Sequence, residues 1–317
     1  MTTRPGRRPP VRVVAGAVAL VAAAALSLAT PISGSILTRD PTWQVNQVTP
    51  AQMEATVDEF GVAYLHPTLR DGTYWVAQWD APRSFDGVDP QDAWFDADHG
   101  SATYEAGGGE LRIGGDLPRM YVHDPQRLRQ WRDVEVTMYV KRLADAGIPF
   151  AGFTAVARAN HLRTEEGRGD LCDTRGYGGR LRFDGHADFE KETAHPHNEA
   201  HSNRLIYAGG MPKDVWLGVK FVVVDQADGV HLELWLDEDD GRDGGDWELV
   251  DEMVDDGGFF GRVPCAPGID PTMPLTSSPS RAGSESGLPN LSVYFRSDGI
   301  APGGLLYKWG SIREIAS

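Results

Sequence analysis

The chain has 317 residues, with 46 acidic residues against 30 lysines and arginines, and its formal net charge at pH 7 is −16. An acidic surplus of this size repels nucleic acid and anionic membrane surfaces, so an anionic ligand can be held only in a local basic patch. The two cysteines have no Cys-x-x-Cys partner, which argues against a zinc or dithiol redox site.

Residues 1–29 predict a secretory signal peptide. Four arginines and no acid precede an apolar run from Val13 to Ala29, and small residues stand at Ser27 and Ala29, where a signal peptidase reads the chain. The run is at the short limit for a bilayer-spanning helix, so an uncleaved N-terminal anchor is the alternative. We therefore expect a secreted, extracellular protein, whose export route the sequence leaves open.

Cys172 and Cys265 predict a disulfide bond, because an even pair of cysteines in an exported protein is commonly oxidised. Closing the long loop between them would stabilise the fold by about 4–5 kcal/mol in the chain-entropy model. Two buried thiols are the alternative.

Residues 30–59 are expected to be extended, with one short helix near their end. Thr49 suits the N-cap of that helix, and Pro50 suits its first position. Residues 60–317 then form one domain, in which segments of period-two alternation predict strands. The clearest of these segments are 133–141, 151–160, 216–225, 229–238, 246–255, 290–298 and 305–315.

The spacing of these segments predicts an all-β fold, an antiparallel two-sheet jelly-roll sandwich with long loops. Short connections, 37 glycines and few helical patterns favour it over a fold of alternating strands and helices. Residues 216–225 are almost continuously apolar, as in a central strand. The stretch 257–289 is rich in proline, serine and glycine and should be a surface excursion.

Residues 178–191 predict a β-hairpin with one basic side. Asp184-Gly185 is typical of a two-residue primed turn, which would set Phe183 opposite His186 and turn His186 away from the basic side. The basic side would carry Arg180, Arg182 and Lys191. Guanidinium groups bind carboxylates and sulfates in bidentate fashion, so this side predicts contacts to an anionic sugar. A solvated hairpin whose arginines pair with surface acids is the alternative.

Three histidines, His195, His197 and His201, follow the hairpin. Histidines four residues apart could share a helical face and bind a metal. Pro196 interrupts such a helix, and the run does not form a His-Glu-x-x-His pattern. A metal site, a catalytic or sugar-facing histidine and a polar loop therefore stay open.

A glycine-rich turn between two predicted strands carries four aspartates, Asp237, Asp239, Asp243 and Asp246. Oxygen-rich loops of this kind suit calcium, so the turn predicts a structural calcium ion as the one cofactor. It lacks the terminal glutamate of a full twelve-residue calcium loop. A solvated acidic turn that blunts the sheet edge is the alternative.

The run of strands that ends in residues 308–315 ("KWGSIREI") resembles the secreted concanavalin A-like lectin/glucanase jelly rolls. The resemblance covers residues 60–315 and implies a bent sandwich whose concave face binds a polysaccharide. It extends distantly to alginate-lyase-type polysaccharide lyases, whose last strand reads Tyr-x-Lys-x-Gly-x-Tyr. Lys308 and Gly310 align with that motif, whereas Leu306 and Ile312 stand in place of its tyrosines.

A lyase that acts on a uronic acid needs a cation to neutralise the carboxylate, a base and an acid. The candidates for these roles are, in that order, Arg182 or Arg296, His186 or His195, and Tyr294 or Tyr307. Further substrate contacts are expected from Arg119, Arg180, Lys191 and Lys308. Hydrolysis is less favoured, because no spacing singles out a pair of carboxylates.

The sequence thus predicts a secreted protein that binds a polysaccharide, with lyase activity as the enzymatic hypothesis. We expect a monomer, and no nucleic-acid or membrane partner beyond the signal segment. A noncatalytic cell-surface or adhesion module, or a structural β-sandwich, is the alternative.

Overall fold

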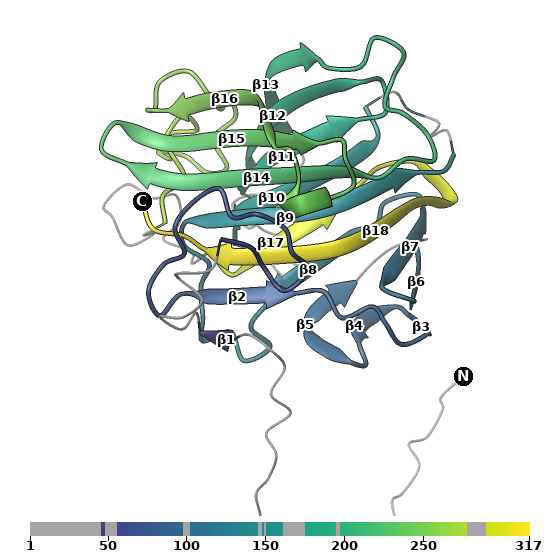
Figure 1. Ribbon diagram of the computed structural model, residues 1–317. Coiled ribbons are helices and arrows are strands. Elements are labelled where there is room, and N and C mark those ends of the chain that lie inside the picture. Colours follow the sequence, from purple (N-terminus) through teal and green to yellow (C-terminus); the bar gives the residue numbers. More distant parts are fainter. Residues whose placement is uncertain are drawn as a thin grey trace, which may run out of the picture. The chain divides into compact units, whose positions relative to one another are not determined.

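Two antiparallel β-sheets form the framework of the described chain (Figure 1). The computed structural model describes residues 56–97, 102–144, 148, 150–160, 175–194, 197–277 and 290–317, with the backbone alone at 46–47 and 301–302. These residues belong to a unit that spans Thr42–Ser317. The predicted signal peptide and most of the predicted extended segment lie outside the described residues.

The larger sheet has ten strands within the described ranges, in the order β16-β15-β14-β9-β18-β7-β6-β3, with β2 pairing with β18 and β1 pairing with β2. Their bounds are β1 Asn46–Gln47, β2 Thr73–Val76, β3 Arg83–Phe85, β6 Thr103–Gly107, β7 Glu110–Gly115, β9 Val134–Arg142, β14 Leu217–Gln226, β15 Gly229–Asp237, β16 Glu248–Asp255 and β18 Ile300–Glu314.

The smaller sheet has eight strands in the part of the chain that the structure describes, in the order β13-β12-β11-β10-β17-β8-β5-β4. Their bounds are β4 Gly87–Asp89, β5 Asp92–Ala97, β8 Arg119–His123, β10 Gly152–Ala159, β11 Gly176–Arg182, β12 His186–Ala194, β13 His197–Leu205 and β17 Ser292–Arg296. The strand order and pairing confirm the predicted antiparallel two-sheet sandwich. All seven predicted strand segments form strands, namely β9, β10, β14, β15, β16, β17 and β18.

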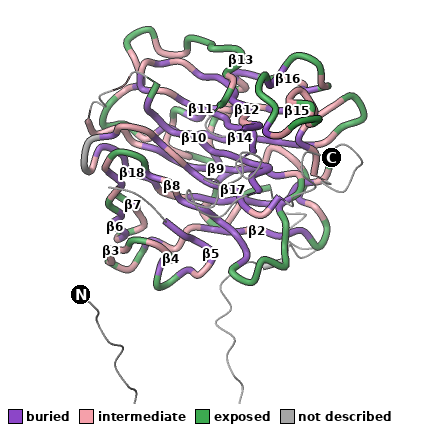
Figure 2. Tube along the Cα trace, turned by 180° about the vertical axis from the view of Figure 1, so that it is seen from behind, coloured by how far each residue is buried: buried purple, intermediate pink, exposed green. Residues whose placement is uncertain are grey.

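The core lies between the inner faces of the two sheets, where buried residues follow the strands (Figure 2). Trp75 of the larger sheet stacks on Phe95 of the smaller one, with ring centroids 5.7 Å apart. Phe153 meets the edge of Tyr307 across the same interface at 5.6 Å. Aromatic pairs of this geometry add to the free energy of burial and fix how the sheets face each other.

Residues 56–68, called here the N-terminal segment, lie across the outer face of the larger sheet (Figure 1). Lys220 of β14 donates to the backbone oxygen of Ala63 and lies 3.0 Å from Glu135 of β9. The second carboxylate oxygen of Glu135 accepts from the backbone of Leu65 and His66. The segment therefore buries the polar face of β9. Its described part forms a turn, whereas a helix was predicted to reach this region.

The hairpin between β11 and β12 has a turn that is one residue longer than predicted. β11 ends at Arg182 and β12 begins at His186, which leaves a three-residue loop with Gly185 at φ 88°. Arg180 consequently pairs with Asp188. Because side chains alternate along a strand, this one-residue shift moves Asp188 and His186 to the arginine side. The prediction that His186 points away from the arginines was wrong.

Candidate functional site

One row of polar side chains crosses five strands of the smaller sheet on its outer face. The register places Arg119 beside Arg296, Arg296 beside Thr154, Thr154 beside Arg180, and Arg180 beside Asp188. The neighbouring residues on these strands, among them Phe153, Leu181 and Phe295, belong to the core. The sheet thus gathers four of the predicted contact residues, Arg119, Arg180, Arg182 and Arg296, on what we call the arginine face.

A second row lies next to the first and is closed to solvent. It contains Tyr121, Tyr294, Val156, Gly178 and Glu190 in register order. The rings of Tyr121 and Tyr294 have centroids 5.0 Å apart, and both residues are at most 4% exposed. The rings therefore pack against the sheet and are not available for stacking with a ligand.

Carboxylates already hold every arginine of this face. Arg180 makes a bidentate pair with Asp188 and also binds Glu190. The other pairs join Arg182 to Asp184 and Asp188, Arg296 to Glu190 and Asp298, and Arg119 to Asp298. Four arginines thus meet four acids, so the hairpin side that was predicted to be basic is close to neutral overall.

Burial shifts the pKa values of two side chains on this face, Arg296 and Tyr294. It lowers the pKa of Arg296 to about 9, and the like charge of Arg119 adds to the effect. Burial raises the pKa of Tyr294 well above its usual range, with a further contribution from Glu192. At neutral pH Arg296 therefore keeps its positive charge, and Tyr294 keeps its proton.

The predicted histidines lie in three different surroundings. His186 lies at the open end of the arginine face, with Nδ1 3.2 Å from a carboxylate oxygen of Asp184. His195 lies outside the described residues. His197 and His201 belong to β13, and the ring of His201 lies 5.4 Å from that of Phe259. Within the described ranges, no three His, Cys, Asp or Glu side chains are placed to hold a metal ion.

Two predicted site residues lie on the core side. Lys191 is fully buried, and its Nζ atom donates to Asp255 at 2.6 Å and to the backbone of Thr272 at 3.1 Å. Tyr307 packs in the core, where burial raises the pKa of its hydroxyl. Neither side chain can contact a ligand on the arginine face, so both predictions were wrong. The hairpin shift explains Lys191, which moved to the opposite side from Arg180 and Arg182.

Lys308 lies on the other sheet. Its Nζ atom lies 3.8 Å from the ring centroid of Trp309 and 4.6 Å from that of Trp216, and 2.5 Å from a carboxylate oxygen of Asp240. These cation–π contacts and the ion pair occupy the ammonium group on the outer face of the larger sheet. Lys308 is therefore not part of the predicted substrate site.

The acidic turn is organised around the carboxylate of Asp237. Its two carboxylate oxygens accept hydrogen bonds from the hydroxyl of Tyr139 and from the backbone of Asp239, Gly241 and Asp246. Asp243 is exposed and takes no part. Asp239 and Asp246 line a groove of about 530 Å³ beside the turn. Among the described residues, no three acids of this turn are placed to hold one metal ion.

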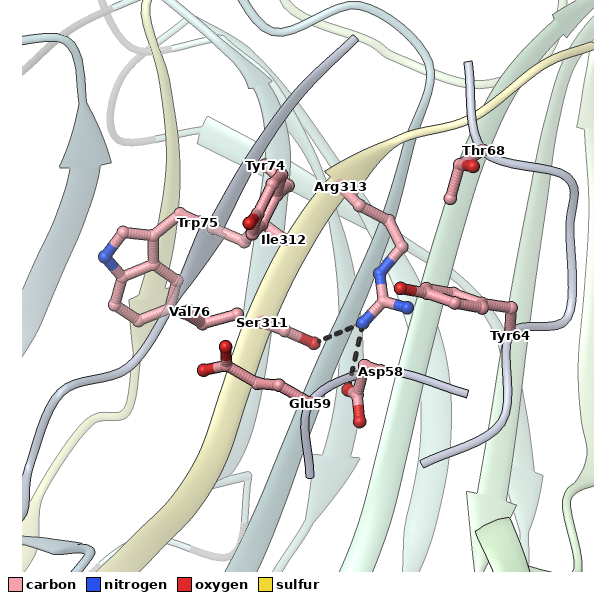
Figure 3. Close-up of a pocket in the computed structure, with 10 residues that line it drawn as sticks. All are labelled: Asp58, Glu59, Tyr64, Thr68, Tyr74, Trp75, Val76, Ser311, Ile312 and Arg313. Atoms are coloured by element: carbon pink, nitrogen blue, oxygen red, sulfur yellow. Dashed lines mark hydrogen bonds and ion pairs between the residues drawn. The ribbon is translucent and has the colours of Figure 1, made fainter. Parts of the chain in front are cut away.

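A small cavity lies between the N-terminal segment and strands β2 and β18 (Figure 3). Arg313 of β18 lies in its wall, with the guanidinium carbon 4.0 Å from the ring centroid of Tyr64. One terminal nitrogen donates to Asp58 at 3.1 Å and to Ser311 at 2.8 Å. No sequence pattern indicated this cavity, because its residues come from both ends of the domain.

Sequence reasoning also missed the acids of the arginine face, Asp188, Glu190 and Asp298. The signal for the first two was present: Arg-x-Arg and Asp-x-Glu lie on the two arms of one hairpin, and opposite charges stabilise cross-strand pairs. Asp298 lies two residues beyond the end of β17 and pairs with both Arg119 and Arg296, whose like charges would otherwise repel.

Cys265 takes part in a disulfide bond. Cys172 lies outside the described residues, so the pairing of the two cysteines stays a prediction. No helical turn in the described ranges has the length and apolar character that crossing a membrane would require.

Neither a protein-family model nor the sequence of a curated protein matches this chain. Among solved structures, the carbohydrate-binding module CBM66 from Bacillus subtilis is 10% identical, with a TM-score of 0.34 over 65% of this chain and 86% of that chain. Lectin II from Ulex europaeus is 10% identical, with a TM-score of 0.40 over 74% of this chain and 99% of the lectin. The exoplasmic/lumenal domain of VIP36, in a Ca²⁺/Man3GlcNAc-bound form, is 11% identical, with a TM-score of 0.40 over 75% of this chain and 92% of that domain. The strand order and pairing give this chain an antiparallel two-sheet β-sandwich.

Proposed function

We propose that this protein binds an anionic polysaccharide through the arginine face of the smaller sheet. The observation that carries the proposal is the gathering of four arginines from β8, β11 and β17 on the side of the sheet that points away from the core. Planar guanidinium groups suit carboxylate and sulfate oxygens, which they bind with two parallel hydrogen bonds.

The four arginines of this face have more N–H donors than the neighbouring carboxylates accept. Each arginine has five N–H groups, and three carboxylates are shared: Asp188 by two arginines, and likewise Glu190 and Asp298. Among the described residues, no acceptor contacts the Nε atoms of Arg182 and Arg296. An acceptor-rich ligand would supply the missing partners.

Exposure along the face indicates where a glycan would bind. The side chains of Asp184, His186 and Asp298 are 23–28% exposed, whereas the tyrosine row is closed. Sugar contacts are therefore expected along the arginine row, through hydrogen bonds and charge. Export by the predicted signal peptide would bring this face to extracellular polysaccharides.

The proposal is binding without cleavage. Tyr307 is in the core and Tyr294 is only 4% exposed, so neither hydroxyl is placed to act as the acid that protonates the leaving oxygen in β-elimination. His186 is the one predicted base that remains on the arginine face within the described ranges, and it is paired with Asp184. Lyase activity is the alternative outcome of the experiment below.

The test is a panel of polyuronates, sulfated glycans and neutral glucans, with both retention of the purified protein and ultraviolet absorbance of unsaturated products measured. Arg182→Gln should weaken retention on the anionic glycans about tenfold, as expected for a lost charge-assisted hydrogen bond, and salt should weaken it further. Arg112→Gln is the matched control, since Arg112 is exposed on the larger sheet. Equal retention of both variants, or retention on neutral glucans alone, would refute the proposal.

A further inference from the structure

We propose that the cavity between the N-terminal segment and strands β2 and β18 binds one small neutral polyhydroxylated molecule, such as a monosaccharide or a polyol (Figure 3). This site lies on the outer face of the larger sheet, so it is separate from the arginine face and does not depend on the polysaccharide proposal. Four of its lining residues, Asp58, Glu59, Tyr64 and Thr68, come from the N-terminal segment, and the others come from β2 and β18.

Arg313 supplies the first observation, because its guanidinium group is only half used. One terminal nitrogen is held by Asp58 and Ser311, which fixes the plane of the group against the ring of Tyr64. The other terminal nitrogen is buried and has no hydrogen-bond partner among the described residues. Arg313 itself is 4% exposed. A buried donor without an acceptor is unfavourable, so a ligand oxygen at this nitrogen would stabilise the site.

Thr68 and Glu59 add two further polar groups to the lining. The hydroxyl of Thr68 is buried without a hydrogen bond within the described chain. The carboxylate of Glu59 lines the same cavity at its exposed rim, and partial desolvation together with the charge of the neighbouring Asp58 raises the pKa of this carboxyl. The cavity thus combines an unpaired donor, a hydroxyl and an exposed carboxylate with the rings of Tyr64 and Tyr74. Sugar hydroxyls both donate and accept, and sugar rings present apolar surfaces to aromatic rings.

The charges of the lining select a neutral ligand. Arg313 contributes one positive charge, and Asp58 and Glu59 contribute two negative charges, so the lining has a formal charge of −1. A ligand with a carboxylate would be repelled at short range by the net negative charge of the lining. An ammonium ligand could not accept the hydrogen bond that Arg313 offers. A neutral polyol satisfies the donor and the acceptor together, without the desolvation of a second charge.

The size of the cavity limits the ligand to one small unit. Its volume of about 60 Å³, measured for water-sized spheres, has room for about four to six water molecules. A short polyol such as glycerol displaces water on this scale, and a single sugar ring would enter the cavity only in part, whereas a polysaccharide chain would not fit. The N-terminal segment forms one wall, so binding should also stabilise its docking on the sheet.

The experiment is a titration of the full exported protein, followed by the NMR amide signals of residues 56–68 and 311–313. The neutral probes are methyl glucoside, galactose, mannose and glycerol, and the charged comparators are glucuronate and glucosamine. We expect at least one neutral probe to shift these signals at millimolar concentration, and the charged comparators to bind at least fivefold more weakly. Tighter binding of either comparator, or no shift with any neutral probe, would overturn the proposal.

Two variants test the contacts. Arg313→Lys retains the charge beside Asp58 but removes the unpaired terminal nitrogen, and Glu59→Ala removes the exposed carboxylate that lines the cavity. Each should weaken binding at least fivefold. If Arg313→Lys fails to fold, Glu59→Ala still decides the question, with Glu105→Ala on β6 as its control. Unchanged binding in Glu59→Ala would refute the site. Arg182→Gln should leave this binding unchanged, which separates it from polysaccharide binding.

Discussion

Arg180 and Asp188 face each other across the β11–β12 hairpin, and both side chains lie on the same outer face of the smaller sheet. Asp188 has no exposed surface, and Arg180 is 9% exposed. A buried ion pair of this kind adds little net stability, because both charges lose their water. Removing only one partner of the pair lowers the stability of the fold strongly, because the remaining charge is then buried without a partner.

Arg180→Ala should therefore destabilise the fold by about 3–5 kcal/mol, because it leaves Asp188 and Glu190 without their main partner. The free energy of unfolding, from urea titrations, is the measurement. Arg182→Ala is the control: Arg182 also contacts Asp188, but it lies closer to solvent and should cost about 1 kcal/mol. Equal losses in the two variants would show that Asp188 is not held mainly by Arg180.

The sequence predicted the hairpin but not its register. Asp184-Gly185 suits a two-residue turn, yet Gly185 takes the left-handed position of a three-residue loop, and both turns use the same residue types. What separates them is tertiary contact: Gly185 lies against the backbone of Tyr207, with hydrogen bonds from Ile206 and Tyr207 to its oxygen. A local pattern carries no information on this neighbour, and a slip of one residue reverses every side chain.

Gly185→Ala tests that contact. An added Cβ atom would lie 2.0 Å from the backbone oxygen of Tyr207, in addition to the strain of φ 88°. Gly87→Ala is the matched control, because Gly87 has φ 90° and a Cβ atom added there would have no atom within 4 Å. The control should lose about 1 kcal/mol from backbone strain alone, and Gly185→Ala at least about 2 kcal/mol more. Similar unfolding free energies would contradict the close approach.

The alternation of single strands predicted which residues share a face, and therefore found Tyr294 and Arg296 together on β17. It could not assign a face to Tyr307, which packs against Phe153 of β10. Nor could it find the cavity at Arg313, whose walls come from the N-terminal segment, β2 and β18. Contacts between residues so distant in the chain depend on how the two sheets and the N-terminal segment pack, and no short pattern specifies that packing.

Asp237→Ala should destabilise the acidic turn strongly and independently of calcium. The variant removes a buried carboxylate that accepts four hydrogen bonds, so we expect a loss of about 3 kcal/mol in unfolding free energy. The double variant Asp239→Ala, Asp243→Ala should lose less than about 1 kcal/mol. Millimolar calcium should leave the melting temperature of the parent protein unchanged. A calcium-dependent rise that the double variant abolishes would restore the predicted metal site.

Cys172 and Cys265 should form one intramolecular disulfide. Thiol alkylation before reduction should leave the intact mass of the exported monomer unchanged, and alkylation after reduction should add two groups. Cys172→Ser and Cys265→Ser should each lose about 4–5 kcal/mol, and the double variant should lose no more than either single one. A covalent dimer, or labelling without reduction, would contradict this pairing.

Asp92 should make the fold less stable as pH rises from 4 to 6. Burial raises the pKa of its carboxyl to about 6, against hydrogen bonds from Trp75 and Trp94 that lower it. In the unfolded chain an aspartate loses its proton near pH 4. Between these values the folded protein binds more protons than the unfolded chain, so stability falls with rising pH, by roughly 3 kcal/mol across the window.

Asp92→Asn should remove this contribution, because an amide does not titrate. The absolute stability of the variant should also change, because the asparagine NH₂ group accepts no hydrogen bond and one of the two tryptophan N–H donors therefore loses its acceptor. The informative quantity is the difference between parent and variant in unfolding free energy, measured in steps from pH 3.5 to pH 7. That difference should shift in favour of the variant by roughly 3 kcal/mol between pH 4 and 6 and stay constant above. A constant difference over the whole range would show that Asp92 is ionised throughout, and that Trp75 and Trp94 offset its burial.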